Sequence, residues 1–325
     1  MLVYGGHRFD KHGVLGRGTF GQVEKVRAVG SRHGLFAAAK YFNSRASTDA
    51  EILREIRMFQ KFCRIYTSNC NNVGPGIAKV TPALYFFGKN RSLCSKYVLM
   101  MPLASCTLLN AISSHTLNEK SKWNIVRDLL RAFKVLQTMK ICHLDITANN
   151  VLMYNGLAQL GDFGAARSYR HLNKTTSLRA RTTEYNESPE MMTNLHVKCK
   201  KKNCRTSCRW VAQAARWVAR NRKKNRSASD YVMNDLWSLY VLGLHMFSES
   251  IDVICALRRH NELRAMHGCL RTSLDEWVKG ACTEFGASDN VTAWLRFTLI
   301  SDPELRPKRQ DAQNYLLKLN VGASQ

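Results

Sequence analysis

Three polar side chains in the middle of the sequence, Asp145, Asn150 and Asp162, have the spacing of a phosphoryl-transfer site. The first two belong to the run HLDITANN, His143–Asn150, and the third opens the triplet Asp162-Phe163-Gly164. In phosphoryl transfer a protein contributes little covalent chemistry and mainly positions the reacting groups. We therefore expect Asp145 to accept or orient a substrate hydroxyl, and Asn150 and Asp162 to bind Mg²⁺.

A glycine-rich segment near the N-terminus is expected to cover the phosphates of ATP. Gly16, Gly18 and Gly21 follow the pattern GxGxxG within Val14–Val23, and they remove side chains where backbone N–H groups approach phosphate oxygens. The pattern alone also fits a dinucleotide fingerprint or an ordinary hairpin turn. A dinucleotide site needs a helix at the third glycine. The residues after Gly21 alternate like a second strand, so an ATP-binding hairpin is favoured.

A lysine and a glutamate upstream would complete the phosphate site. Lys40 is the single cation of the apolar run Leu35–Phe42, which predicts a strand whose lysine reaches the α- and β-phosphates. The segment Ala50–Phe62 has apolar residues at helical spacing. Glu51 and Glu55 lie one turn apart on it, and Glu55 is the preferred partner of Lys40, with Glu51 as the alternative. A surface lysine at a strand end is the competing interpretation of Lys40.

The adenine ring would lie between the hairpin and a later strand. Val23 is expected to pack on the ring, and Leu15, on the other arm of the hairpin, is expected to belong to the same nucleotide-binding site. A strand predicted over Lys96–Met101 leads into a connector at which backbone groups of Met101 and Leu103 would hold the adenine edge.

The remaining elements follow from periodicity and capping signals. Residues 63–82 are polar and predict a loop, and Thr116-x-x-Glu119 predicts a capping box that opens a long helix. The other expected elements are a strand at Ala83–Gly88, two small strands at Val151–Met153 and Ala158–Leu160, a buried helix around Leu236–Phe247, and a capping box at Ser273-x-x-Glu276.

Composition places the chain among globular proteins. It has 325 residues, of which 45% are hydrophobic and 22% charged. The N-terminal residues do not resemble a signal peptide, and the apolar run in Leu236–Phe247 is too short to span a bilayer, so no membrane partner is expected. The 11 cysteines, an odd number without regular spacing, indicate a reducing compartment such as the cytosol or nucleus.

Almost half of the formal net charge of +25 lies in one block of the sequence. Residues 198–226 contain 12 Lys and Arg and no acidic residue, which leaves +13 on the rest of the chain. Basic clusters at Lys200–Lys202 and Arg222–Arg226 favour a two-part nuclear localisation signal recognised by the import machinery. Nucleic-acid binding, a docking helix for acidic substrates and a plain solvated loop are the alternatives.

The joint order of these motifs resembles that of the eukaryotic-type protein kinase superfamily over nearly the full length. Further matches are Thr183, Ser188-Pro189-Glu190, Asp235-Leu236-Trp237-Ser238 and Arg306. The resemblance implies an α+β bilobal fold, with a small mainly-β lobe at 1–101 and a large mainly-α lobe at 102–325. It also implies an Arg306–Glu190 ion pair, and it makes about 194–229 an insert, since Glu190 and Asp235 are much closer in the family.

Two departures from the family pattern lie in the catalytic loop. Leu144 replaces the Arg that in the family binds a phosphorylated activation loop, so activity is expected without such a phosphorylation. Loss of activity on dephosphorylation would contradict this. Thr147 replaces a Lys that contacts the γ-phosphate, so that contact is missing or replaced.

The run HLDITxxNVL resembles, more narrowly, the protein kinases conserved in herpesviruses. This resemblance implies a Ser/Thr kinase of the host nucleus or virion that uses ATP and Mg²⁺, autophosphorylates, and acts on viral and host nuclear proteins; a cytoplasmic location is the alternative. Two other functions stay open: a degenerate kinase that serves as a basic scaffold for nucleic acid or protein, and a kinase of nucleosides. Lys40, Asp145, Asn150 and Asp162 argue against the first. Thr183, Glu190 and Arg306, which in the family shape a protein-substrate platform, favour protein substrates and leave a side activity on nucleosides open.

Overall fold

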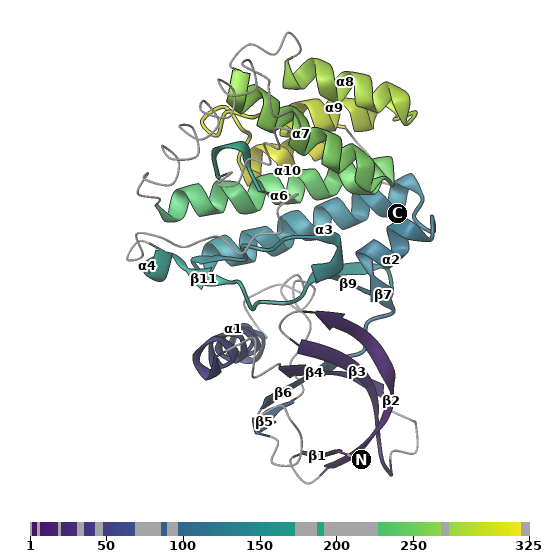
Figure 1. Cartoon of the computed structure of the whole chain (residues 1–325), viewed down its shortest axis with the longest axis vertical. Helices are drawn as coiled ribbons and strands as arrows, with labels where there is room; N and C mark the ends of the chain where they lie inside the picture. The colour runs from purple at the N-terminus through teal and green to yellow at the C-terminus, as the bar shows by residue number, and fades with distance from the viewer. Residues whose placement is uncertain are drawn as a thin grey trace, which may run out of the picture. The chain divides into compact units, whose positions relative to one another are not determined.

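The computed structural model describes most of the chain and divides it into two compact units (Figure 1). The first unit comprises Met1–Leu108 and Asn150–Ala166, and the second comprises Leu109–Asn149 and Arg167–Gln325. The residues described are 2–4, 7–18, 21–30, 36–42, 48–68, 86–89, 97–172, 187–191, 227–267 and 273–319.

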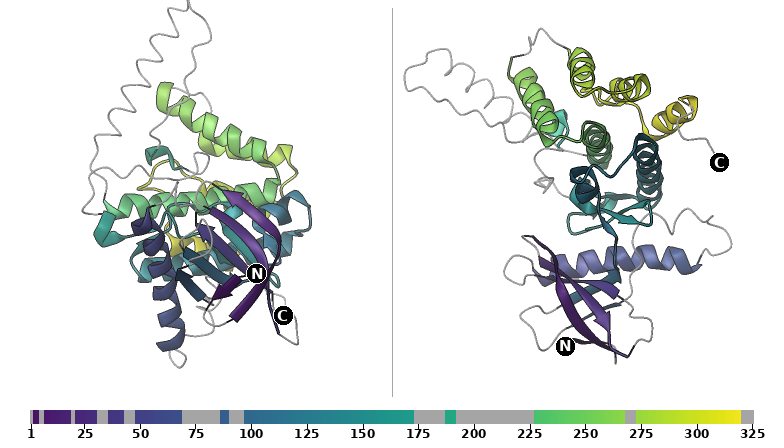
Figure 2. Two further views of the ribbon diagram at one scale, coloured as in Figure 1. Left: turned by 60° about the horizontal axis from the view of Figure 1, so that its bottom comes forward. Right: turned by 90° about the vertical axis from the view of Figure 1, so that its right-hand side faces the viewer.

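The first unit is built on an antiparallel sheet with the strand order β1-β2-β3-β4-β6-β5. Its strands are β1 (Leu2–Tyr4), β2 (His7–Gly18), β3 (Gly21–Ala28), β4 (Phe36–Phe42), β5 (Phe86–Lys89) and β6 (Tyr97–Pro102). Helix α1 (Asp49–Ser68) lies beside this sheet in both views of Figure 2. The predicted strands around Lys40 and Met101 and the helix at Ala50–Phe62 are therefore confirmed.

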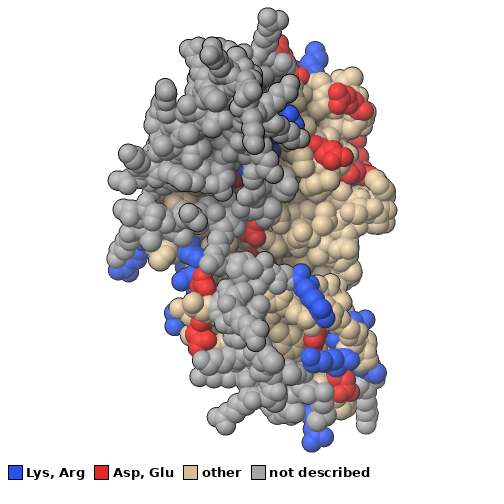
Figure 3. Space-filling view, viewed as in Figure 1, with Lys and Arg blue, Asp and Glu red and all other residues tan. Residues whose placement is uncertain are grey.

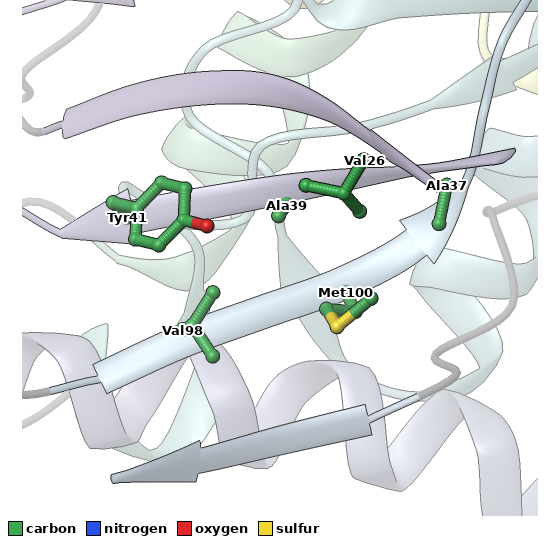
Figure 4. Packing of buried hydrophobic residues seen from close by; sticks show 6 residues of the cluster. All are labelled: Val26, Ala37, Ala39, Tyr41, Val98 and Met100. Atoms are coloured by element: carbon green, nitrogen blue, oxygen red, sulfur yellow. The ribbon is translucent and has the colours of Figure 1, made fainter. Parts of the chain in front are cut away.

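Alternation along β4 separates the core of the sheet from the face that carries Lys40. Ala37, Ala39 and Tyr41 point to one face, where they pack with apolar residues of β3 and β6 (Figure 4). Because successive side chains of a strand point to opposite faces, Ala38 and Lys40 lie on the other face. The sheet thus buries one row of β4 as core and presents the second row to α1.

A second, smaller sheet in the first unit has the order β10-β9-β7. Its strands are β7 (Cys106–Thr107), β9 (Val151–Tyr154) and β10 (Leu157–Leu160), which confirms the two predicted small strands. The first unit therefore takes in Asn150–Ala166, including Asp162, whereas the predicted lobe boundary after residue 101 assigns that segment to the second domain. The reason is the pairing of β9 with β7, and a contact of Asp162 with β4 described below.

The second unit is mainly helical. Its elements are α2 (Leu108–Ser113), α3 (Glu119–Thr138), α4 (Tyr169–Leu172), α6 (Ala228–Ser248), α7 (Ile251–His267), α8 (Leu274–Glu284), α9 (Asp289–Thr298) and α10 (Arg309–Lys318), with the short strands β8 (Ile141–Cys142) and β11 (Arg167–Ser168). Trp123 of α3 packs on Phe247 of α6 and Trp294 of α9, with ring centroids 4.7 and 6.1 Å away. A β-rich first unit and a helical second unit confirm the α+β class.

Two predictions about element ends are wrong, and one is confirmed. Helix α3 is capped by Asn118, whose side chain accepts a hydrogen bond from Ser121 N, while the Thr116 hydroxyl donates to Ala111 O instead. Asparagine is as good an N-cap as threonine, and it lies closer to the first helical residue. Helix α1 also continues to Ser68, into the segment predicted as a loop. The capping box at Ser273 and Glu276 is present.

The predicted apolar helix is buried within α6. Among the described residues, no helix is both long enough and apolar enough to cross a lipid bilayer.

The face drawn in Figure 3 has both signs of charge, in different proportions over different elements. Lys and Arg side chains lie over β2 and β3, whereas Asp and Glu side chains gather over α8. Exposed residues of α8 include Asp275, Glu276 and Glu284.

Candidate active site

Lys40 is the centre of a buried charged cluster in the first unit. Its Nζ lies 2.7 Å from Oε1 of Glu55 on α1 and 2.9 Å from Oδ1 of Asp162. The Lys40 side chain is 8% exposed and that of Glu55 is 4% exposed. Three residues far apart in the sequence thus meet at one ammonium group.

The two carboxylates keep Lys40 charged. Burial alone would lower the pKa of its ammonium group, but the charges of Glu55 and Asp162 and their hydrogen bonds raise the pKa above its ordinary value. The contact with Glu55 holds this cation in place, because breaking it would leave the buried Glu55 carboxylate without a compensating charge.

Glu51, the alternative partner, is used at the start of α1. Its Oε2 accepts hydrogen bonds from the backbone N–H and the hydroxyl of Thr48, and Thr48 Oγ1 accepts one from Glu51 N. This reciprocal pair is a capping box, which satisfies backbone groups of the first turn. The structure therefore assigns the two glutamates to different tasks, and Glu55 alone of the two reaches Lys40.

Asp162 is fixed from several sides. Its backbone has φ +51°, and its Oδ1 accepts a hydrogen bond from Gly164 N at 3.2 Å. A Cβ at Gly164 would lie 3.2 Å from both Asp162 Oδ1 and Glu55 Oε2, so glycine suits this tight corner. Phe163 is fully buried between Phe59 and Phe62 of α1, with ring centroids 5.2 and 4.8 Å away. Apolar packing and hydrogen bonds hold the carboxylate in place together.

Asn150 and Asp162 have the chemistry of a magnesium site. The carbonyl of Asn150 accepts a hydrogen bond from Gly161 N at 2.7 Å, which joins the backbone of the two segments. The Asp162 side chain is 40% exposed, so a ligand can reach it. Mg²⁺ prefers oxygen ligands and is held in such sites by one or two side chains together with water and phosphates, so the pair fits this ion.

The glycine hairpin forms as predicted. Gly18 is opposite Gly21, and Gly16 is opposite Val23, across the β2–β3 pair. Gly21 is required by the fold itself, because a Cβ there would clash with the carbonyl oxygen of Tyr41. Leu15 is exposed on β2, where no other side chain buries it.

The predicted adenine contacts lie on the same face as Lys40. Val23 is directly opposite Lys40 between β3 and β4, and Met101 is opposite Ala38 between β6 and β4. Directly opposed residues of antiparallel strands share a face. Leu103 follows β6 directly. The Tyr154 hydroxyl donates a hydrogen bond to the carbonyl of the preceding residue, Pro102, at 3.1 Å, and this contact stabilises the segment after β6.

The second unit holds the segment with Asp145 through a buried aspartate. Asp235, on α6 and 1% exposed, accepts hydrogen bonds from His143 N at 2.6 Å and Leu144 N at 2.8 Å. Burial raises the pKa of Asp235 to about 7, against the two hydrogen bonds, which lower it. The sequence matched Asp235 to a motif but did not indicate its role. In the structure it binds the backbone of a loop that lies more than 90 residues earlier in the chain.

Leu144 occupies an unusual backbone position. Its φ is +66°, a left-handed value that disfavours branched side chains, and its side chain is 2% exposed. The following residue, Asp145, is only partly buried, and its N–H donates to His143 Nδ1 at 3.3 Å. Asp235 and the buried Leu144 side chain therefore fix the backbone that leads into Asp145.

The sequence model of the family described as "Protein kinase domain" matches residues 9–208, more than half of the chain. The chain belongs to the protein kinase family. The β-rich first unit and the helical second unit agree with the bilobal kinase fold.

Curated relatives of this kinase domain are similar over about half of the chain. "Serine/threonine-protein kinase KIC1" of Saccharomyces cerevisiae is 30% identical over 190 residues, 57% of this chain and 16% of that protein. "Misshapen-like kinase 1" of Rattus norvegicus is 30% identical over 159 residues, 49% of this chain and 11% of that protein. "Putative serine/threonine-protein kinase L673" of Acanthamoeba polyphaga mimivirus is 24% identical over 164 residues, 50% of this chain and 27% of that protein. The matched part of the chain thus spans a minor part of each relative.

Of the other residues in the kinase resemblance, the structure describes Arg306 but not Thr183 or the side chain of Glu190. Arg306, 2% exposed, donates to the carbonyls of Ile300, Ser301 and Met233, and its guanidinium lies 4.8 Å from the Trp237 ring centroid. Thr183, the side chain of Glu190 and the basic insert lie outside the described residues. The predicted Arg306–Glu190 pair stays a prediction.

Proposed function

We propose that the protein is an ATP- and Mg²⁺-dependent kinase that transfers the γ-phosphoryl group to Ser or Thr hydroxyls of proteins. The observation that carries the proposal is the contact of Lys40 with both Glu55 and Asp162 inside the first unit. A degenerate scaffold would have no use for this set, because a buried ion pair contributes less to stability than apolar packing would.

Each residue of the site has a task in this reaction. Lys40, steadied by Glu55, holds the phosphates of ATP, and the glycine hairpin presents its backbone N–H groups to them. Asp162 and Asn150 hold Mg²⁺, which neutralises charge that develops on the phosphates. Asp145 accepts or orients the substrate hydroxyl, in a loop whose backbone Asp235 fixes. Catalysis then consists mainly of positioning and electrostatic stabilisation.

The decisive assay compares the purified protein with Asp145→Asn in labelled ATP and Mg²⁺. We expect the variant to lose activity on a protein substrate by roughly 10²–10⁴-fold, the usual contribution of a positioned acid–base group. Equal labelling by the two proteins would rule out the assigned chemistry. Nucleosides in place of protein substrate test the alternative small-molecule kinase.

The finer proposal concerns substrates: viral and host nuclear proteins, together with autophosphorylation. It rests on the resemblance of HLDITxxNVL, with Leu144 and Thr147, to the herpesvirus protein kinases. The location follows from the same resemblance and from the basic clusters in residues 198–226. We expect a fluorescent fusion of the full chain to enter the nucleus, and to be excluded when Lys200–Lys202 and Arg222–Arg226 are replaced by Ala. An unchanged distribution would contradict the import signal.

A further inference from the structure

Helix α3 carries a basic face that the catalytic site does not use. Six residues at spacings of three and four lie within an arc of about 80° of the helix and extend over about 27 Å. We call this set the α3 stripe: Lys120, Asn124, Arg127, Arg131, Lys134 and Thr138. All are exposed except Arg127, which is partly buried, while the opposite side of the helix forms part of the core.

The stripe contains four cations and no acidic residue. Asp128, at its flank, lies 3.2 Å from the guanidinium of Arg131, whose side chain is still 56% exposed. Arg127 donates to Asn124 Oδ1 at 2.9 Å. Burial lowers the pKa of Arg127, and the charge of Arg131 lowers it further.

Stability alone does not explain this arrangement. Like charges one helical turn apart repel each other and destabilise a helix. Arg127 and Arg131 are such a pair, and Lys134 follows Arg131 by three residues. A polyanion laid along the stripe would turn this repulsion into attraction.

The neutral members of the stripe help to identify the anion. An interface with a protein is usually centred on apolar or aromatic side chains, and none is present at the six positions. Lys, Arg, Asn and Thr are, by contrast, the side chains that donate hydrogen bonds to phosphate oxygens of nucleic acids. The absence of an exposed aromatic ring at these positions also removes the platform on which bases stack.

We infer that the α3 stripe binds the phosphate backbone of nucleic acid, without reading its sequence. This site uses other residues than the basic insert, and it does not depend on the proposed kinase activity. Four cations in a row predict a strongly salt-dependent affinity, with up to four counterions released on binding.

The test is binding of the full chain to a labelled 20-nucleotide single strand and to a 20-base-pair duplex, measured by fluorescence anisotropy at several salt concentrations. In the variant Lys120→Gln/Arg127→Gln/Lys134→Gln, Arg131 is kept because it pairs with Asp128. Glutamine preserves helix propensity. Removal of three phosphate contacts should weaken binding about a hundredfold at 0.1 M salt and reduce the slope of log K against log salt by about 2 to 3.

A matched control removes the same charge elsewhere. Arg8→Gln/Arg259→Gln/Lys279→Gln neutralises three exposed cations outside α3, and it should bind nearly as well as the original protein. Equal weakening in both triple variants would show that only net charge matters and would overturn the inference. Unchanged binding by the α3 variant would overturn it too, since the insert or another surface would then account for the affinity. Loss of poly-glutamate binding with intact nucleic-acid binding would assign the stripe to an acidic protein instead.

Discussion

Lys40→Met should abolish phosphoryl transfer and destabilise the protein by about 3 kcal/mol. The stability loss is expected because removing one partner of a buried ion pair leaves the other charge without compensation. Here Glu55, 4% exposed, would face Asp162 with no cation between them. Chemical denaturation measures the first effect, and labelled-ATP transfer to a protein substrate measures the second.

A double variant separates the two effects. In Lys40→Met/Glu55→Met both buried charges are replaced by flexible apolar side chains of similar length, so most of the lost stability should return. Activity should stay absent, because no cation is left to hold the phosphates. A double variant as unstable as the single one would show that Glu55 is not the charge stranded by the loss of Lys40.

The stability loss of Lys40→Met should also depend on pH. Burial and the charge of Asp162 raise the pKa of Glu55, and Lys40 opposes them, so the variant retains only the two raising causes. A carboxyl group whose pKa is higher in the folded protein contributes stability at low pH that is lost as pH rises through that value. The variant should therefore lie closer in stability to the original protein at pH 5 than at pH 8.

Asp235→Asn should reduce kcat at least tenfold and leave the KM for ATP nearly unchanged. The carboxylate accepts both the His143 and the Leu144 N–H groups, but an amide offers one oxygen and turns an NH₂ towards the second donor. A buried N–H left without an acceptor costs about 1–3 kcal/mol. The loop that contains Asp145 would relax, while Lys40 and Asp162, the proposed nucleotide-binding residues of the first unit, keep their contacts with each other.

Tyr240→Phe is the matched control on the same helix. Its hydroxyl is buried and donates to the carbonyl of Pro307 at 2.9 Å, away from the loop with Asp145. The variant should lose about 1 kcal/mol of stability and keep its kcat. If Tyr240→Phe and Asp235→Asn lowered kcat equally, Asp235 would have a general structural role instead of a positioning one.

Local sequence patterns correctly predicted the helices and strands of the site. They were less reliable in choosing which of two nearby residues has a given role. The helical period placed Glu51 and Glu55 on the same face, so periodicity could not choose between them. The choice depends on Thr48, which engages Glu51 at the helix start. The same kind of competition made the expected cap of α3 wrong, because Asn118 is nearer the helix than Thr116.

The anchoring of the catalytic loop could not be read from local sequence. Leucine disfavours positive φ, so nothing about Leu144 indicates a left-handed residue. The conformation is imposed by Asp235, on a helix 91 residues further along the chain. Interactions of this range depend on the assembled fold, and only the motif match brought Asp235 to attention.

The burial of Phe163 between Phe59 and Phe62 has a consequence for how the molecule tolerates change. The ring is adjacent in sequence to Asp162, and α1 also carries Glu55, so one apolar contact sets the distance between two carboxylates and their shared lysine. A methylene lost from either phenylalanine of α1 would be a minor defect in most hydrophobic interiors. Here a change in the packing of these rings would also shift the carboxylates of Glu55 and Asp162 relative to Lys40, so a packing defect would weaken the ion pairs. Substitutions at Phe59 or Phe62 are therefore expected to affect the Lys40 contacts as well as the packing of α1.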